Sequence, residues 1–134
     1  MDRIFLDANI LFSAAYSPQA SVHELWLLPG AELVTSFYVI EESRRNLAAA
    51  CPVCLPRLGE LLEHVTVVLG MRSAELPRGI ELPDKDAPVL LAAIDSGCTH
   101  LLTGDLRHFG RLYGRVISGV RVESPARYLR ARSG

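Results

Sequence analysis

Several features that mark whole classes of protein are missing from this sequence. Its longest apolar run covers only residues 89–94, whereas a membrane-spanning helix needs roughly 18 apolar residues. Neither sign of charge is in excess, since 14 basic residues stand against 15 acidic ones. The glycine-rich motifs that cradle nucleotide phosphates do not occur either. These gaps argue against a membrane protein, against a protein that wraps duplex DNA by bulk positive charge, and against a nucleotide-binding fold.

Cysteine is also scarce, with three residues in the chain. Three thiols cannot all pair with one another, and Asp7 and Asn9 interrupt the apolar stretch that could otherwise pass for a secretory signal. We therefore expect a cytoplasmic protein whose thiols are reduced. Cys51 and Cys54 have the C-x-x-C spacing of half a zinc site, but no second pair accompanies them, so two free thiols are favoured over a zinc ribbon.

What is present is typical of one packed domain. The chain has 134 residues, of which 49% are hydrophobic and 22% charged, and we expect residues 1–134 to form a single domain. Apolar patterning predicts strands at residues 4–6, 32–35, 65–68, 99–103 and 115–122. It predicts helices at residues 8–16, 20–28, 37–50, 56–63 and 87–96. Nearly continuous apolar strands that alternate with helices predict a mainly parallel sheet with helices on both faces.

Acidic residues stand at the ends of these expected elements. Asp7 follows the first strand and Asp105 follows the fourth. Asp86 opens the helix before the fourth strand, and either Glu41 or Glu42 lies in the first turns of the helix after the second. Ligands of open parallel sheets bind at the carboxyl ends of the strands, so these acids can share one edge. Converging carboxylates repel one another until a divalent cation binds, and oxygen ligands favour Mg²⁺ or Mn²⁺, which predicts metal-dependent phosphodiester hydrolysis.

The order and spacing of these residues also resemble a known family. An Asp-Ala-Asn sequence ends the first strand, a glutamate comes six residues after Ser36, an aspartate opens an apolar helix, and Thr103-Gly104-Asp105 follows a later strand. Together with the closing segment 122–129, this pattern resembles the PIN-domain ribonucleases of the VapC type over almost the whole chain. The resemblance implies a three-layer α/β/α sandwich with a parallel sheet of four or five strands. It also implies cleavage of single-stranded RNA at an acidic site that holds Mg²⁺ or Mn²⁺.

The resemblance further implies roles for individual residues. The catalytic and metal-binding acids that it assigns are Asp7, Glu42, Asp86 and Asp105. Asn9 and Thr103 would orient these acids or a water molecule. Glu42 is preferred to Glu41 because of its spacing from Ser36, and the choice matters because one residue on a helix turns the side chain by about 100°.

Each of these residues also has a purely structural interpretation. Asp86 and Asp105 can be helix N-caps, and a glutamate in a first turn can simply favour the helix dipole. Asn9 can be an ordinary cap and Thr103 an ordinary strand residue. Four histidines lack metal-ligand spacing and are interpreted as structural or surface residues: His23, His64, His100 and His108. The alternative function is a non-catalytic PIN-like module that binds RNA or protein.

Positive charge is concentrated near the end of the chain. From Arg107 onward there are seven arginines and one acid, a local net charge of +6. We expect Arg107 and Arg111 to contact RNA phosphates, with Arg44 and Arg45 as the next candidates. For the toxins of this family, the resemblance also implies a small antitoxin protein as partner and a homodimer. The residues themselves do not separate a toxin from an RNA-processing enzyme.

Overall fold

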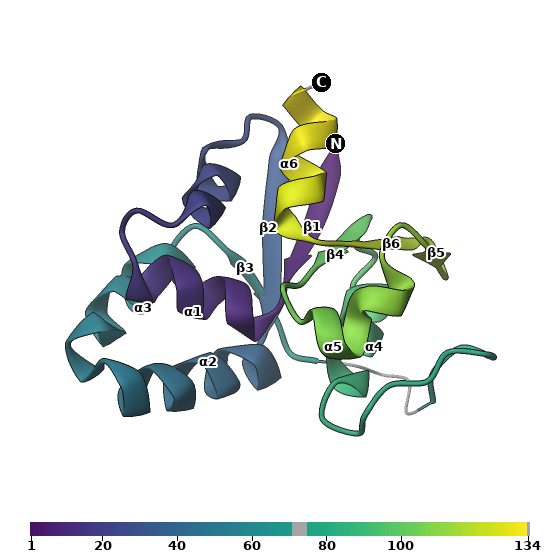
Figure 1. Cartoon of the computed structure of the whole chain (residues 1–134), viewed down its shortest axis with the longest axis horizontal. Coiled ribbons are helices and arrows are strands. Elements are labelled where there is room, and N and C mark those ends of the chain that lie inside the picture. The colour runs from purple at the N-terminus through teal and green to yellow at the C-terminus, as the bar shows by residue number, and fades with distance from the viewer. Residues whose placement is uncertain (71–74, 134) are drawn as a thin grey trace.

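The computed structural model describes residues 1–70 and 75–133 and contains one mixed sheet with helices on both sides (Figure 1). The strands are β1 (Asp2–Leu6), β2 (Ala31–Ser36), β3 (Thr66–Val68), β4 (His100–Leu102), β5 (Val116–Ile117) and β6 (Val120–Glu123). Their order across the sheet is β3, β2, β1, β4, β6, β5. Every neighbouring pair is parallel except β5 and β6. The predicted α/β fold with a mainly parallel sheet is therefore confirmed.

The end of the sheet differs from the single strand predicted over residues 115–122. The chain turns at Ser118 and Gly119, whose φ angles are 49° and 88°. Positive φ at both central residues is typical of a tight two-residue hairpin turn, and β5 pairs antiparallel with β6 around it. The described residues therefore form a six-stranded sheet in place of the expected four or five strands.

The helices make up the two outer layers. They are α1 (Ala8–Tyr16), α2 (Phe37–Ala50), α3 (Leu55–Leu62), α4 (Ala87–Asp95), α5 (Leu106–Phe109) and α6 (Pro125–Ser133), with 3₁₀ helices η1 (Ser21–Leu27), η2 (Pro52–Cys54) and η3 (Gly110–Leu112). Helix α1 packs against α2 and α3 on one side, and α4 and α5 lie on the other (Figure 1). Among the helices described, none is both long and apolar enough to cross a membrane.

One expected α-helix, over residues 20–28, is instead the 3₁₀ helix η1. Ala20 offers no capping side chain at its start, and of its seven residues only Leu25 is buried. Without a cap or a wide apolar face, this segment has little to stabilise a regular α-helix.

The central strands position the functional edge of the sheet. Ile4, Phe5 and Leu6 of β1 have no exposed surface, which is possible only because helices cover both faces of the strand. In the pairing of β1 with β4, Leu6 lies opposite Leu102. The next residue of each strand, including Asp7, therefore emerges side by side with its neighbour at the carboxyl edge.

The cysteines depart from the sequence-based expectation. Cys51 and Cys54 form a disulfide, so the prediction of two free thiols was wrong for this pair. The 3₁₀ turn η2 brings their Cα atoms to 5.4 Å, which is within the range that a disulfide spans. Cys98 is free and buried.

Candidate active site

The carboxyl edge of the sheet is organised around Asp7, which ends β1 and caps α1. Its Oδ1 accepts a hydrogen bond from the backbone N–H of Ala8 at 2.7 Å, and its Oδ2 accepts one from the Thr103 hydroxyl at 2.8 Å. Asn9 Nδ2 lies 3.4 Å from the same Asp7 Oδ2 and donates to Thr103 Oγ1 at 3.2 Å. The Asp7 carboxylate thus connects the end of β1, the start of α1 and the residue that follows β4.

Thr103 links two of the predicted acids. It is fully buried just after β4, and its hydroxyl donates to Asp7 while accepting the backbone N–H of Asp105 at 3.1 Å. With the bond from Asn9, the hydroxyl uses its one proton and both lone pairs. The Asn9 side-chain oxygen, Oδ1, also accepts a hydrogen bond from the Gly104 backbone N–H at 2.7 Å. Thr103 and Asn9 therefore contact the acid that they were predicted to orient.

Burial gives Asp7 an unusual protonation equilibrium. The side chain is only 5% exposed, and this desolvation raises the pKa of its carboxyl to about 6, against the lowering effect of its hydrogen bonds to Thr103 and Ala8. The negative charges of Glu42 and Asp86 raise the pKa of Asp7 further. Glu42 and Asp86 are therefore close enough to repel Asp7, although the three residues come from separate elements.

The two adjacent glutamates of α2 face different surroundings. Glu41 is exposed and pairs with Arg44 at 2.6 Å along the same helix. Glu42 is only partly exposed and acts electrostatically on Asp7. The next residue, Ser43, is fully buried and donates to the carbonyls of Val39 and Ala8, which turns this side of α2 toward α1. The orientation of α2 thus favours Glu42 as the acid that faces the site.

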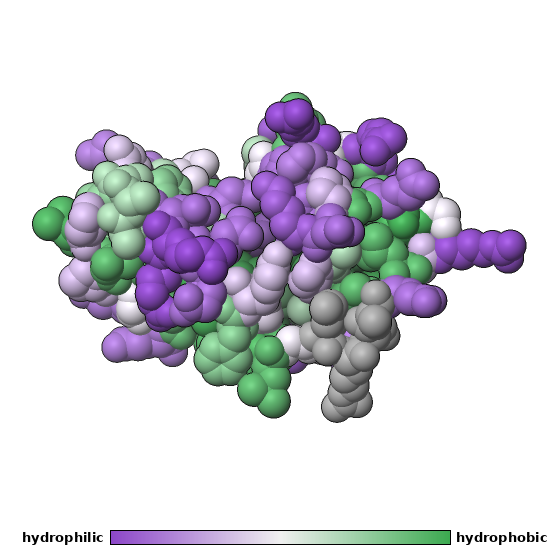
Figure 2. Space-filling view, turned by 90° about the horizontal axis from the view of Figure 1, so that it is seen from below, coloured by the Kyte–Doolittle hydropathy of each residue, from purple (hydrophilic) through white to green (hydrophobic). Residues whose placement is uncertain are grey.

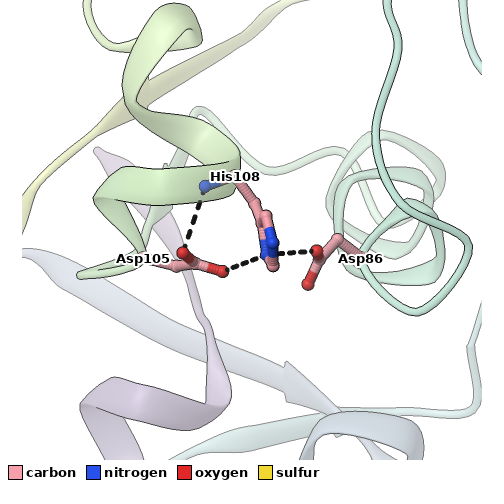
Figure 3. A group of neighbouring side chains, drawn as sticks. All are labelled: Asp86, Asp105 and His108. Carbon is pink, nitrogen blue, oxygen red and sulfur yellow. Dashed lines mark hydrogen bonds and ion pairs between the residues drawn. The ribbon is translucent and has the colours of Figure 1, made fainter.

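Asp86 and Asp105 meet at His108, as Figure 3 shows. Asp105 caps α5, accepting the His108 backbone N–H at 3.1 Å on Oδ1, and its Oδ2 lies 2.9 Å from His108 Nδ1. The same Nδ1 lies 2.9 Å from Oδ2 of Asp86, which approaches from the start of α4. The ligand atoms of these three residues all lie within 4.8 Å of one another.

Of these two carboxylates, Asp86 has fewer hydrogen bonds. It is 7% exposed, and although it stands at the N-cap position of α4, its side chain makes no capping hydrogen bond. Its Oδ2 lies 2.9 Å from His108 Nδ1, but the Nδ1–H bond has hydrogen-bond geometry only toward Asp105. The buried Asp86 Oδ2 therefore receives no hydrogen bond from the described residues. Burial and the charge of Asp105 raise the pKa of Asp86, while His108 opposes them.

The helix-cap interpretation therefore holds for one aspartate and fails for the other. Asp105 is a helix cap, as that interpretation predicted, and it also contacts His108. The capping interpretation of the Asp86 side chain was wrong. His108 was expected to be an ordinary structural or surface residue, and it instead lies between two candidate ligands. The Asp-x-x-His spacing at the start of a short helix is the sequence signal that points to this contact.

Figure 2 shows the molecule of Figure 1 from below, and this is the face at which β1 and β2 end. Hydrophilic side chains gather across the middle of this face, and hydrophobic ones flank them. The acidic residues described above lie at the carboxyl ends of these strands and at the starts of α2, α4 and α5. This is the edge at which open α/β sheets bind ligands.

Comparison with known proteins gives matches among solved structures. No protein-family model matches the chain, and no curated protein matches it. VapBC2 from Rickettsia felis, bound to a DNA fragment from its promoter, has a TM-score of 0.69 at 18% identity, covering 91% of this chain and 98% of that one. VapBC-1 from nontypeable Haemophilus influenzae has a TM-score of 0.62 at 16% identity, covering 92% and 98%. VapC20 from Mycobacterium tuberculosis, a sarcin-ricin loop cleaving toxin, has a TM-score of 0.57 at 17% identity, covering 76% and 91%.

These neighbours are VapC toxins, which are PIN-domain ribonucleases, and the matches cover 76–92% of this chain. The chain has a PIN-domain fold. This confirms the fold that the sequence pattern implied. At such low identity the likeness establishes the architecture.

The arginines that follow this PIN-domain edge are not all available to a ligand. Three of them bind partners within the fold. Arg121 donates a hydrogen bond to the carbonyl of Gly114, and Arg127 forms an ion pair with Glu123. Arg132 forms an ion pair with Asp2 and donates to the carbonyl of Pro29. In the part of the chain that the structure describes, Arg107 and Arg111 are exposed and their side chains form no hydrogen bond or ion pair. Arg111 also lines a cavity of about 130 Å³ together with His108 and Arg115.

Proposed function

We propose that this PIN-domain chain is a divalent-metal-dependent ribonuclease that hydrolyses phosphodiester bonds of single-stranded RNA. The observation that carries this proposal is Asp7, a buried carboxylate at the carboxyl edge whose pKa is raised to about 6 and which Glu42 and Asp86 repel. Such an arrangement is costly for a protein without a cation, and clustered perturbed carboxylates are typical of functional sites.

The donor set fits a hard divalent cation. The residues that would hold Mg²⁺ or Mn²⁺ are Asp7, Glu42, Asp86 and Asp105, and the buried Asp86 Oδ2 that accepts no hydrogen bond offers a free lone pair for it. When bound, the cation supplies Lewis acidity for a water nucleophile and for the charge on the phosphate. The chain itself holds the acids still, since Thr103 and Asn9 fix Asp7 and the first turn of α5 fixes Asp105.

The RNA strand needs positive charge beside this acidic edge. Arg107 and Arg111 belong to the segment that directly follows Asp105, and neither guanidinium forms an ion pair with an acid of the described residues. We infer that they bind phosphates flanking the scissile one, which positions the strand without reading its bases. Arg44 is a weaker candidate because it is already paired with Glu41.

The biological role inferred from the neighbours is that of a toxin. Two of the matched structures are VapBC complexes, and a third protein is named as a toxin that cleaves the sarcin-ricin loop. We therefore propose that this chain acts in the cytoplasm and is held inactive by a cognate antitoxin protein, with a homodimer as the expected assembly. Co-purification with the product of an adjacent small gene, and loss of RNA cleavage in that complex, is the matching test.

Cleavage of a fluorescently labelled single-stranded RNA tests the chemistry. Activity should require Mg²⁺ or Mn²⁺ and should be abolished by Asp7→Asn and by Glu42→Gln. Glu41→Gln is the matched control, because it removes the same charge from the same helix turn without facing Asp7. RNA binding without cleavage by the wild-type chain would instead support the non-catalytic module, and the reverse result for the two glutamates would show that Glu41 faces the metal.

A further inference from the structure

The imidazole of His108 occupies the place between two of the acids proposed to hold the metal. Its Nδ1 lies 2.9 Å from Oδ2 of Asp86 and 2.9 Å from Oδ2 of Asp105 (Figure 3). The ring is held there by its own helix turn, because the His108 backbone N–H donates to Oδ1 of the same Asp105 at 3.1 Å. Histidine and aspartate are therefore positioned as one unit at the start of α5.

The spacing of these atoms is the spacing of metal ligands. In octahedral coordination with metal–ligand distances of about 2.1 Å, neighbouring ligand atoms are roughly 3.0 Å apart. The two contacts of Nδ1 match that value, and all three ligand atoms lie within 4.8 Å of one another. A cation bound among these residues can therefore keep both Nδ1 separations as they are.

The hydrogen-bonding pattern independently points to a ligand. When Nδ1 carries a proton, that one proton is shared between two carboxylates, and its direction suits only Asp105. The Oδ2 atom of Asp86 is buried and receives no hydrogen bond from the described residues, although a buried acceptor is normally satisfied. One cation in place of this proton would satisfy both carboxylates together with the ring nitrogen.

We propose that His108 is a nitrogen ligand of the divalent-metal site, bound through Nδ1 beside Asp86 and Asp105. This inference rests on the proposed function and adds one imidazole nitrogen to the carboxylate oxygens proposed there as ligands. Imidazole suits first-row transition metals, whereas Mg²⁺ prefers oxygen. The site should therefore select Mn²⁺ over Mg²⁺, and His108 is the residue responsible for that selection.

Pulsed electron paramagnetic resonance of the full chain loaded with Mn²⁺ reads the ligand directly. We expect a modulation from a coordinated imidazole nitrogen in the wild-type protein and in the control His64→Ala, which removes an exposed histidine elsewhere. The modulation should be absent from His108→Ala and His108→Gln. Both variants retain the backbone N–H that Asp105 caps, and a thermal melt checks that they fold.

Metal titrations of the same proteins measure the selectivity. Loss of an outer hydrogen-bonding partner alone typically lowers metal affinity by about 10–100-fold, so loss of His108 should weaken Mn²⁺ binding by at least about tenfold. Mg²⁺ binding should weaken by less than about threefold, because an oxygen from water can replace the nitrogen. Competition between the two metals, followed by the Mn²⁺ signal, gives both affinities.

Three outcomes would overturn this assignment: no Mn²⁺ binding to the wild-type chain, Mn²⁺ bound without nitrogen modulation, or equal losses of Mn²⁺ and Mg²⁺ affinity in His108→Ala. The second is decided on the wild-type protein, so it does not depend on any variant folding. RNA cleavage is scored separately. Nitrogen-coordinated Mn²⁺ without cleavage refutes the nuclease proposal alone, and cleavage with Mn²⁺ bound only by oxygen refutes the role of His108 alone.

Discussion

Replacing Asp7 by asparagine should make the metal-free protein more stable above neutral pH. The pKa of Asp7 is raised from 3.8 to about 6, chiefly by burial. A shift of about two units corresponds to roughly 3 kcal/mol by which folding is weakened once the carboxyl is ionised in both states. Asparagine has nearly the same shape and carries no charge, so Asp7→Asn removes this cost while its side-chain oxygen still accepts a hydrogen bond.

The sign of the pH dependence follows from the direction of this shift. Well below its ordinary pKa of 3.8, Asp7 is protonated in both the folded and the unfolded chain, and its burial costs little. As the pH rises through 4 to 6, the unfolded chain loses its proton first, so the folded state is progressively destabilised. Above pH 6 the full cost is present. The advantage of Asp7→Asn should therefore grow over this window and level off near pH 7.

Thermal unfolding in the presence of a metal chelator measures the effect. At pH 8 we expect Asp7→Asn to melt about 10 °C above the wild-type chain, on the basis of roughly 3–5 °C per kcal/mol for a domain of this size. At pH 4 the two should differ little. Asp84→Asn, at an exposed aspartate, is the matched control and should leave the melting temperature nearly unchanged. An equal gain at both pH values, or no gain at pH 8, would show that the buried charge is not what limits stability.

Further predictions address the remaining parts of the site. Millimolar Mg²⁺ or Mn²⁺ should raise the melting temperature of the wild-type chain, because a metal that binds the folded state stabilises it by mass action. The Asp7→Asn, Asp86→Asn double variant should show no such rise, and an equal rise would place the metal elsewhere. Thr103→Val should lower the free energy of unfolding by about 1–3 kcal/mol at neutral pH, because Asp7 loses a hydrogen bond. It should also raise the pKa of Asp7 further in an NMR pH titration, whereas Thr103→Ser should behave like the wild-type chain. Changing both Arg107 and Arg111 to glutamine should flatten the salt dependence of single-stranded RNA binding in Ca²⁺ by about one unit per lost phosphate contact, and an unchanged slope would exclude them from the RNA path.

Much of the fold could be predicted because local signals agree with tertiary packing. The boundaries of α1 and α2 match the expected residues 8–16 and 37–50, since each follows a capping side chain, Asp7 or Ser36, and α2 ends just before Pro52. The single strand predicted over residues 115–122 was wrong because the dipeptide Ser118-Gly119, a turn signal inside that run, folds the chain back on itself.

The site was only partly predictable for a different reason. The positions of Asp7 and Asp105 follow from strand ends, which a sequence pattern locates well. The role of His108 depends on the approach of α4 to α5, since Asp86 comes from an element 22 residues away in the sequence. The disulfide between Cys51 and Cys54 likewise depends on the local backbone of η2, which composition does not specify.

The pairing of Thr103 with the last strand has a consequence for a chain that is still being synthesised. The Thr103 backbone N–H donates to the carbonyl of Glu123 at 3.1 Å, and its own carbonyl accepts the Tyr113 hydroxyl. Thr103 in turn holds Asp7, almost a hundred residues earlier. Until the ribosome has released residue 123, β4 lacks one of its two neighbours, and Thr103, which holds Asp7, lacks its backbone partner Glu123. A nascent chain that carries every acidic residue of the site therefore still lacks the assembled site.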